Sequence, residues 1–138
     1  MADVDLTSFF TQKKREFGTQ NQNGGKFDDD FRDAVNYAIG EINLEADLST
    51  TITEISGPTG TVANLDKKYG YVLSVGTTLW LMLIGRRPPR GADKAINAIN
   101  QKFHDSIQSM ATSIRNIATY ADTDDETATN IGLGPVGP

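Results

Sequence analysis

The chain has 138 residues, of which 38% are hydrophobic and 22% are charged, so it is the size of one domain with a modest core. It contains no cysteine and one histidine, which excludes disulfides, thiolate metal sites and sites built from several histidines. Charge is uneven: residues 1–85 carry 7 basic and 12 acidic groups, 86–120 carry 6 and 2, and 121–138 carry 0 and 4. The acidic total argues against nucleic acid as the main partner, whereas alternating acidic and basic segments suit docking between copies of the chain.

Two helices are predicted in the first third of the chain. Leu6, Phe9, Phe10 and Phe17 recur at near-helical spacing over residues 5–17, with Asp5 as the cap. The polar, glycine-rich segment 18–26 is predicted to be a loop. Spacings of three and four then predict a helix over 29–45, capped by Asp28 with Phe27 as a hydrophobic staple. Its apolar positions are Phe27, Phe31, Ala34, Val35, Ala38 and Ile42.

Residues 49–65 change character. Threonine and isoleucine alternate, and "GPTG" then marks a turn, which predicts a short β-hairpin or an extended arm. Because an isolated two-stranded hairpin is marginal in water, this arm is expected to lean on the helices or on another subunit.

The most apolar run, Tyr69 to Gly85, has 17 residues without a charge. A membrane-spanning helix needs about 20 mostly apolar residues, so the run predicts a buried core helix over 66–84, with Trp80 in the core. Asp66 is its predicted cap, and Gly85 with "RRPPR" ends it.

A long helix is predicted over 92–119. Its apolar stripe consists of Ile96, Ile99, Phe103, Ile107, Met110, Ile114 and Ile117. A 28-residue helix spans about 42 Å, which is long for so small a domain, so one end is expected to project. Residues 121–138 are acidic and then rich in glycine and proline, which predicts a tail without a fold of its own.

The predicted fold class is therefore mainly α. Residues 1–120 form one domain, a small bundle of three to four helices with the arm at 49–65. Residues 121–138 form a non-helical C-terminal tail.

Candidate chemistry is sparse. Asp28, Asp29, Asp30 and Asp33 gather at a helix start, where acids are stabilising in any case. Glu41 and Glu45 lie four residues apart on one helix face and are expected to be solvated or to face a partner. His104, beside Phe103, is expected to be a boundary residue. No catalytic, cofactor-binding or metal-binding residue is assigned, and the chain is not expected to be an enzyme.

The order of these segments resembles that of the small head–tail connector (adaptor) proteins of tailed bacteriophages. The resemblance is carried by "DDDFRDAVNYAIGEIN", "STTITEISGPTGT", "YVLSVGTTLWLMLIG", the long closing helix and "DTDDETATNIGLGP". It implies a structural virion protein, made in the host cytoplasm and located at the head–tail junction. Its subunits would form a ring, commonly a dodecamer, between the portal protein and the tail or the next ring. DNA would pass through the lumen without sequence-specific binding, and no membrane or cofactor is implied.

The predicted partner-binding residues fall in three regions: Arg86, Arg87 and Arg90; the tail residues Asp122, Asp124, Asp125, Glu126, Ile131 and Leu133; and Ile52, Ile55 and Val62 of the arm. Two alternatives stay open. One is a peripheral membrane protein that uses the apolar segment 69–85, and the other is a small metal-dependent enzyme with an acidic site at 28–33.

Overall fold

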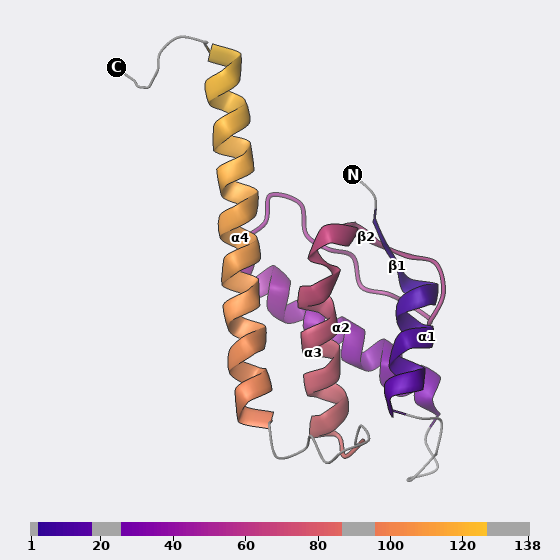
Figure 1. The fold of residues 1–138 in the computed structure, drawn as a ribbon. Coiled ribbons are helices and arrows are strands. Elements are labelled where there is room, and N and C mark those ends of the chain that lie inside the picture. The colour runs from indigo at the N-terminus through magenta and orange to yellow at the C-terminus, as the bar shows by residue number, and fades with distance from the viewer. Residues whose placement is uncertain (1–2, 18–25, 87–95, 127–138) are drawn as a thin grey trace.

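The computed structural model describes residues 3–17, 26–86 and 96–126, with side chains of the last helix described as far as Asn116 (Figure 1). The elements in chain order are β1 (Asp3–Asp5), α1 (Leu6–Phe17), α2 (Phe27–Ala46), β2 (Thr61–Asp66), the 3-10 helix η1 (Lys67–Tyr69), α3 (Gly70–Leu83) and α4 (Ile96–Glu126). The mainly helical fold is confirmed. Helix α3 packs against both α2 and α4, and the buried side chains form one core.

Helix α1 matches its predicted range and cap. Asp5 Oδ1 accepts a hydrogen bond from the backbone N–H of Thr7 at 3.1 Å, and Oδ2 accepts one from the Ser8 hydroxyl at 2.8 Å. The helix is held on α2 by rings: Phe9 and Phe10 approach Phe31 with centroid distances of 5.5 and 5.0 Å. Such tilted and edge-on pairs add to the stabilisation from burial.

Helix α2 starts earlier than predicted. Its first residue is Phe27 and the preceding Lys26 makes no side-chain cap, so the predictions of Asp28 as cap and Phe27 as staple are wrong. Asp28, Asp29 and Asp30 all lie in the first turn, where the N-terminal end of the helix dipole stabilises carboxylates without a capping bond. Burial of Phe27 accounts for the earlier start, because a helical Phe27 lies on the same apolar face as Phe31.

Of the two alternatives predicted for residues 49–65, the structure has the extended arm that leans on the helices, and the strand pairing is made with β1 near the N-terminus. Strand β2 pairs antiparallel with β1, and Val4 lies opposite Val62. The segment before β2 is not itself a strand, and it makes one backbone hydrogen bond to β2, from the N–H of Thr53 to the carbonyl of Ala63 at 3.3 Å. Two asparagines of α2 also bind this segment. Asn36 donates to the carbonyl of Ile55 and accepts from its N–H, at 2.9 and 2.8 Å. Asn43 does the same for Ile52, at 2.9 Å for both bonds.

Helix α3 is central and short. Asp66 is confirmed as a cap, since its Oδ1 accepts from the N–H of Lys68 at 3.1 Å, although η1 intervenes before α3 begins. The end is a Schellman motif: Gly85 has φ of 99°, its N–H donates to the carbonyl of Met82, and the N–H of Arg86 donates to that of Leu81. Within the described ranges no helix has the length and hydropathy to cross a membrane.

Trp80 is not a fully buried core residue as predicted. It is partly buried at the side of the bundle and stacks on Tyr37, with ring centroids 4.8 Å apart. Gly76, one turn earlier on α3, is the position that lies close to both α2 and α4. A Cβ on Gly76 would lie 2.5 Å from the Phe103 ring and 2.7 Å from Ala38 Cβ.

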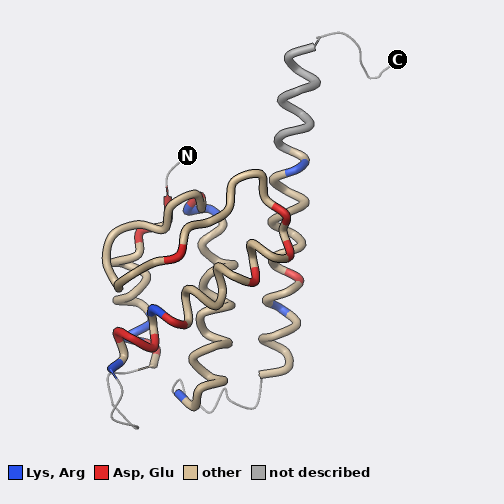
Figure 2. The backbone as a smooth tube through the Cα atoms, turned by 180° about the vertical axis from the view of Figure 1, so that it is seen from behind, with Lys and Arg blue, Asp and Glu red and all other residues tan. Residues whose placement is uncertain are grey.

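The predicted stripe of α4 faces the core as far as it is described: Phe103, Ile107 and Met110 are fully buried, and Ile96, Ile99 and Ile114 are partly buried against the core. The side chain of Ile117 lies outside the described residues. The helix continues to Glu126, so the prediction that the helix ends at 119 and a non-helical tail begins at 121 is wrong at this boundary. No glycine or proline occurs between Gly91 and Gly132, and Ala118 and Ala121 favour helix, which allows the helix to run on. Its C-terminal part rises beyond the other elements (Figure 1). The view from behind shows the acidic residues at the start of α2 (Figure 2). Residues 127–138 lie outside the described residues.

Candidate functional site

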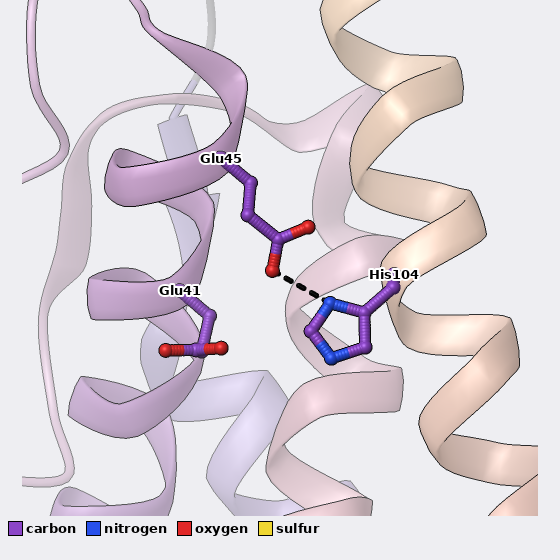
Figure 3. A group of neighbouring side chains, drawn as sticks. All are labelled: Glu41, Glu45 and His104. Atoms are coloured by element: carbon purple, nitrogen blue, oxygen red, sulfur yellow. Dashed lines mark ion pairs between the residues drawn. The ribbon is translucent and has the colours of Figure 1, made fainter.

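Three potential ligand groups converge between α2 and α4. Glu41 and Glu45 extend from α2 toward His104 on α4 (Figure 3). One ligand atom from each residue can be chosen so that all three lie within 4.8 Å of one another. Nδ1 of His104 lies 2.6 Å from Oε2 of Glu45, so the imidazole and the carboxylate connect the two helices directly. All three side chains are partly buried.

The helix packing explains this convergence. Glu41 and Glu45 are one turn apart and adjoin the buried positions Ala38 and Ile42 of α2. His104 follows Phe103, which is fully buried against α3 and α2. Burying the Phe103 ring therefore fixes the rotation of α4 and brings His104 to the edge of the core, opposite the two glutamates.

The two glutamates also act on a neighbouring tyrosine. Burial, followed by the charges of Glu41 and Glu45, raises the pKa of the Tyr37 hydroxyl, which lies one turn before Glu41 on α2. Glu45 contacts His104, whereas Glu41 has no ion-pair or hydrogen-bond partner among the described residues. Two carboxylates and one imidazole in this arrangement suit a divalent cation that accepts both nitrogen and oxygen ligands. Without a cation, the Glu45–His104 contact serves as a link between α2 and α4.

The other acidic group of α2 is arranged differently. Asp29 and Asp33 both pair with Arg32, at 3.7 and 3.2 Å, and their side chains are more than half exposed. Asp30 instead turns toward Arg86, whose Nε lies 2.6 Å from Asp30 Oδ2. Among the described residues, the only group of three or more potential metal ligands is that of Glu41, Glu45 and His104.

The predicted partner-binding residues are dispersed. Arg86 packs over the Phe27 ring and pairs with Asp30 of its own chain, so its side chain supports the fold of the subunit. Ile52 and Val62 are 2% and 0% exposed in the chain's own core, and Ile55 is partly buried against it. Ile52 and Val62 therefore face the core of their own subunit, held there by the Asn43 bonds and by the pairing with β1, whereas Ile55 stays a predicted partner contact.

The remaining predicted residues are not described at the side-chain level. Asp122, Asp124, Asp125 and Glu126 fall in the last turns of α4, where the structure gives the helical backbone. Arg87, Arg90, Ile131 and Leu133 lie outside the described residues.

An open apolar cavity of about 370 Å³ lies beside the part of α4 that projects. Its lining includes Leu48 from the segment after α2, Leu65 and Tyr69 around the end of β2, and Ile114 of α4. Sequence reasoning did not find this cavity, because its walls come from three segments that become neighbours only in the fold.

Sequence reasoning also missed the approach of His104 to the glutamates. The spacing of Glu41 and Glu45 did signal one helix face, but the matching position on α4 depends on how far α4 is shifted along α2. Comparison with known proteins gives no match: no protein-family model fits the chain, and no curated protein or solved structure is significantly similar to it.

Proposed function

We propose that the protein is a structural connector subunit that assembles into a ring between the portal and the tail of a bacteriophage particle. The resemblance in segment order supports this assignment, and so does the length of α4, which is the observation that carries it. At 1.5 Å per residue, the 31 residues of α4 span about 46 Å and the 14 of α3 about 21 Å.

The projecting part of α4 is expected to contact a partner. The last fully buried side chain described on α4 is Ala111, and the helix runs a further 15 residues to Glu126. Most helical stability in proteins comes from tertiary packing, so a helix that leaves its own bundle is stabilised by contact with another surface. A neighbouring subunit or the portal protein would supply that surface.

Charge favours a basic partner surface. Asp122, Asp124, Asp125 and Glu126 lie at the C-terminal end of α4, where the helix dipole disfavours acids. Basic groups on a partner would offset this repulsion, and Arg87 and Arg90 of a neighbouring subunit are our candidates. Arg86 is not among these candidates, because it forms an ion pair with Asp30 of its own subunit.

Apolar contact surface is also present. Leu83 and Ile84 at the end of α3 are 51% and 36% exposed, and the cavity lined by Leu65 and Ile114 opens next to the projecting helix. In a ring, an apolar side chain of one subunit would fill this cavity in the next. These features support assembly and require no catalytic residue.

The mass of the protein in solution tests the proposal. We expect the full chain, alone or with the portal protein of the same genome, to form a discrete ring, about 180 kDa for twelve copies of a 15.0 kDa chain. A variant that ends at Asn116 should stay monomeric and should not bind the portal protein. Sedimentation velocity and electron micrographs give both results.

Three outcomes would overturn the proposal. A full chain that remains monomeric and does not bind portal rings would do so, and so would a truncated variant that assembles as the parent does. Binding to lipid vesicles in place of portal rings would favour the peripheral membrane alternative.

A further inference from the structure

We propose that Glu41, Glu45 and His104 form a binding site for a divalent transition-metal ion, with Zn²⁺ as the best match, that links α2 to α4. The inference does not depend on the proposed connector function, since it rests on side-chain geometry within one subunit. The three side chains meet in one place from two helices (Figure 3).

The geometry needs only small side-chain movements. Zn²⁺ holds imidazole nitrogen at about 2.0–2.1 Å and carboxylate oxygen at about 2.0–2.2 Å, which places ligand atoms about 3–3.5 Å from one another. The ligand atoms of the three residues lie within 4.8 Å of one another, and the Glu45–His104 contact is 2.6 Å. Rotation about the glutamate side-chain bonds can bring Glu41 in and let the Glu45 carboxylate separate from the imidazole, with both helices in place.

The ligand set selects among metals. A site of one imidazole and two carboxylates suits Zn²⁺ and its transition-metal neighbours, whereas Mg²⁺ prefers oxygen ligands and retains its waters. Three protein ligands leave one position of a tetrahedral ion open to water, which agrees with the partial exposure of the site. The two negative charges of Glu41 and Glu45, which already act on Tyr37, would be offset by the ion.

The composition makes the site easy to isolate experimentally. His104 is the only histidine and the chain has no cysteine, so any imidazole-dependent metal binding by the untagged protein reports on His104 alone. Zn²⁺ binding to the full untagged chain can be measured by calorimetry. In the same samples, NMR follows the ring signals of His104. These signals can be assigned without a variant, because the chain has no other histidine.

We expect the His104 ring signals to shift on addition of Zn²⁺ and not on addition of Mg²⁺. Glu45→Gln and His104→Gln should each weaken Zn²⁺ binding at least tenfold, with circular dichroism confirming that the helices persist. The matched control is the double variant Asp29→Asn/Asp33→Asn, which removes two carboxylates from the other acidic group of α2 and should bind within twofold of the parent.

Any one of three results would overturn the site. The first is that the His104 signals do not move at 1 mM Zn²⁺, which would show that the imidazole is not a ligand. The second is that Zn²⁺ binds to His104→Gln as tightly as to the parent. The third is that the Asp29/Asp33 control weakens binding as much as Glu45→Gln, and the second and third would both assign the binding to general acidic surface.

Discussion

Gly76 is a residue at which the three central helices are in close contact. A Cβ there would lie 2.5 Å from Phe103 on α4 and 2.7 Å from Ala38 on α2, so even one methyl group requires the helices to separate. Gly40 lies in the middle of α2, is exposed, and has open space where a Cβ would be. The two glycines therefore differ in packing but share the same helical setting.

We predict opposite signs for the two alanine substitutions. Gly76→Ala should lower the free energy of unfolding by about 1–3 kcal/mol through overpacking. Gly40→Ala should raise it by about 0.5–1 kcal/mol through helix propensity. Urea denaturation measures both, and equal effects of the two substitutions would show that Gly76 is not a packing position.

Lys13 is a second instructive residue, because its charge is buried. Its side chain is 3% exposed, and its ammonium donates to Glu16 at 3.1 Å and to the Thr78 hydroxyl at 2.7 Å. Burial lowers the pKa of Lys13 below its ordinary value of 10.5, and this outweighs the opposing effect of Glu16. The folded state thus releases the Lys13 proton at lower pH than the unfolded state does.

The sign of the resulting pH dependence follows from proton linkage. Between the folded pKa and 10.5 the unfolded state binds more protons, so the Lys13 contribution to stability rises with pH across that window. The unfolding free energy of the parent should therefore gain on that of Lys13→Met as pH approaches 10.5. Lys14→Met, on the exposed side of α1, controls for the loss of one positive charge. The prediction would be contradicted if the unfolding free energy of the parent minus that of Lys13→Met stayed constant or fell with rising pH.

At the scale of elements, α2 acts as a substitute strand for the segment before β2. Asn36 and Asn43 are seven residues apart, two helical turns, so both face the same way. Each side-chain amide donates to the carbonyl and accepts from the N–H of one backbone residue, as a neighbouring strand would. This arrangement satisfies backbone groups at Ile52 and Ile55 that burial would otherwise leave unpaired.

Asn36→Ala and Asn43→Ala should each lower the unfolding free energy by about 1–3 kcal/mol, since each leaves a backbone donor and acceptor unpaired. The loss should also be local. Amide hydrogen exchange should accelerate at Ile55 in the first variant and at Ile52 in the second. Asn100→Ala, at an exposed position of α4, is the control. Unchanged exchange at both amides would remove the asparagines from this role.

Helix prediction from sequence succeeded where a repeating pattern was enough. The stripes of α2 and α4 repeat every three to four residues, and Asp5, Asp66 and Gly85 act at helix ends as expected. Strand β1 was missed because it has three residues and its partner lies more than fifty residues away. The His104 site depends on the relative positions of two helices, which no local pattern encodes. The roles of Asn36 and Asn43 were not predicted, because their sequence pattern is that of ordinary polar helix positions.

At the scale of the whole molecule, α4 has a part that packs on the bundle, as far as Ile114, and a part that extends beyond the other elements (Figure 1). Phe103, Ile107 and Met110 join the common core, and the helix then leaves it. The bundle should therefore fold without the projecting part.

Removal of residues 117–138 should leave the stability of the bundle nearly unchanged, within about 0.5 kcal/mol, because the described core ends before Asn116. Thermal unfolding followed by circular dichroism measures this at a concentration where the parent is monomeric. A truncated chain that unfolds many degrees earlier would show that the projecting part packs on its own bundle.

The pairing of β1 with β2 also sets an order of events during synthesis. Asp5 precedes its partner Thr61 by 56 residues, which take roughly 3–11 s to synthesise at about 5–20 residues per second. Until then β1 has no partner, although α1 and α2 can already form by local contacts. The β1–β2 sheet must therefore close late, since its long loop carries a closure cost that local helix formation avoids. Val4 and Leu6 stay available to wrong partners throughout that interval, so conditions that slow synthesis should increase aggregation of the nascent chain.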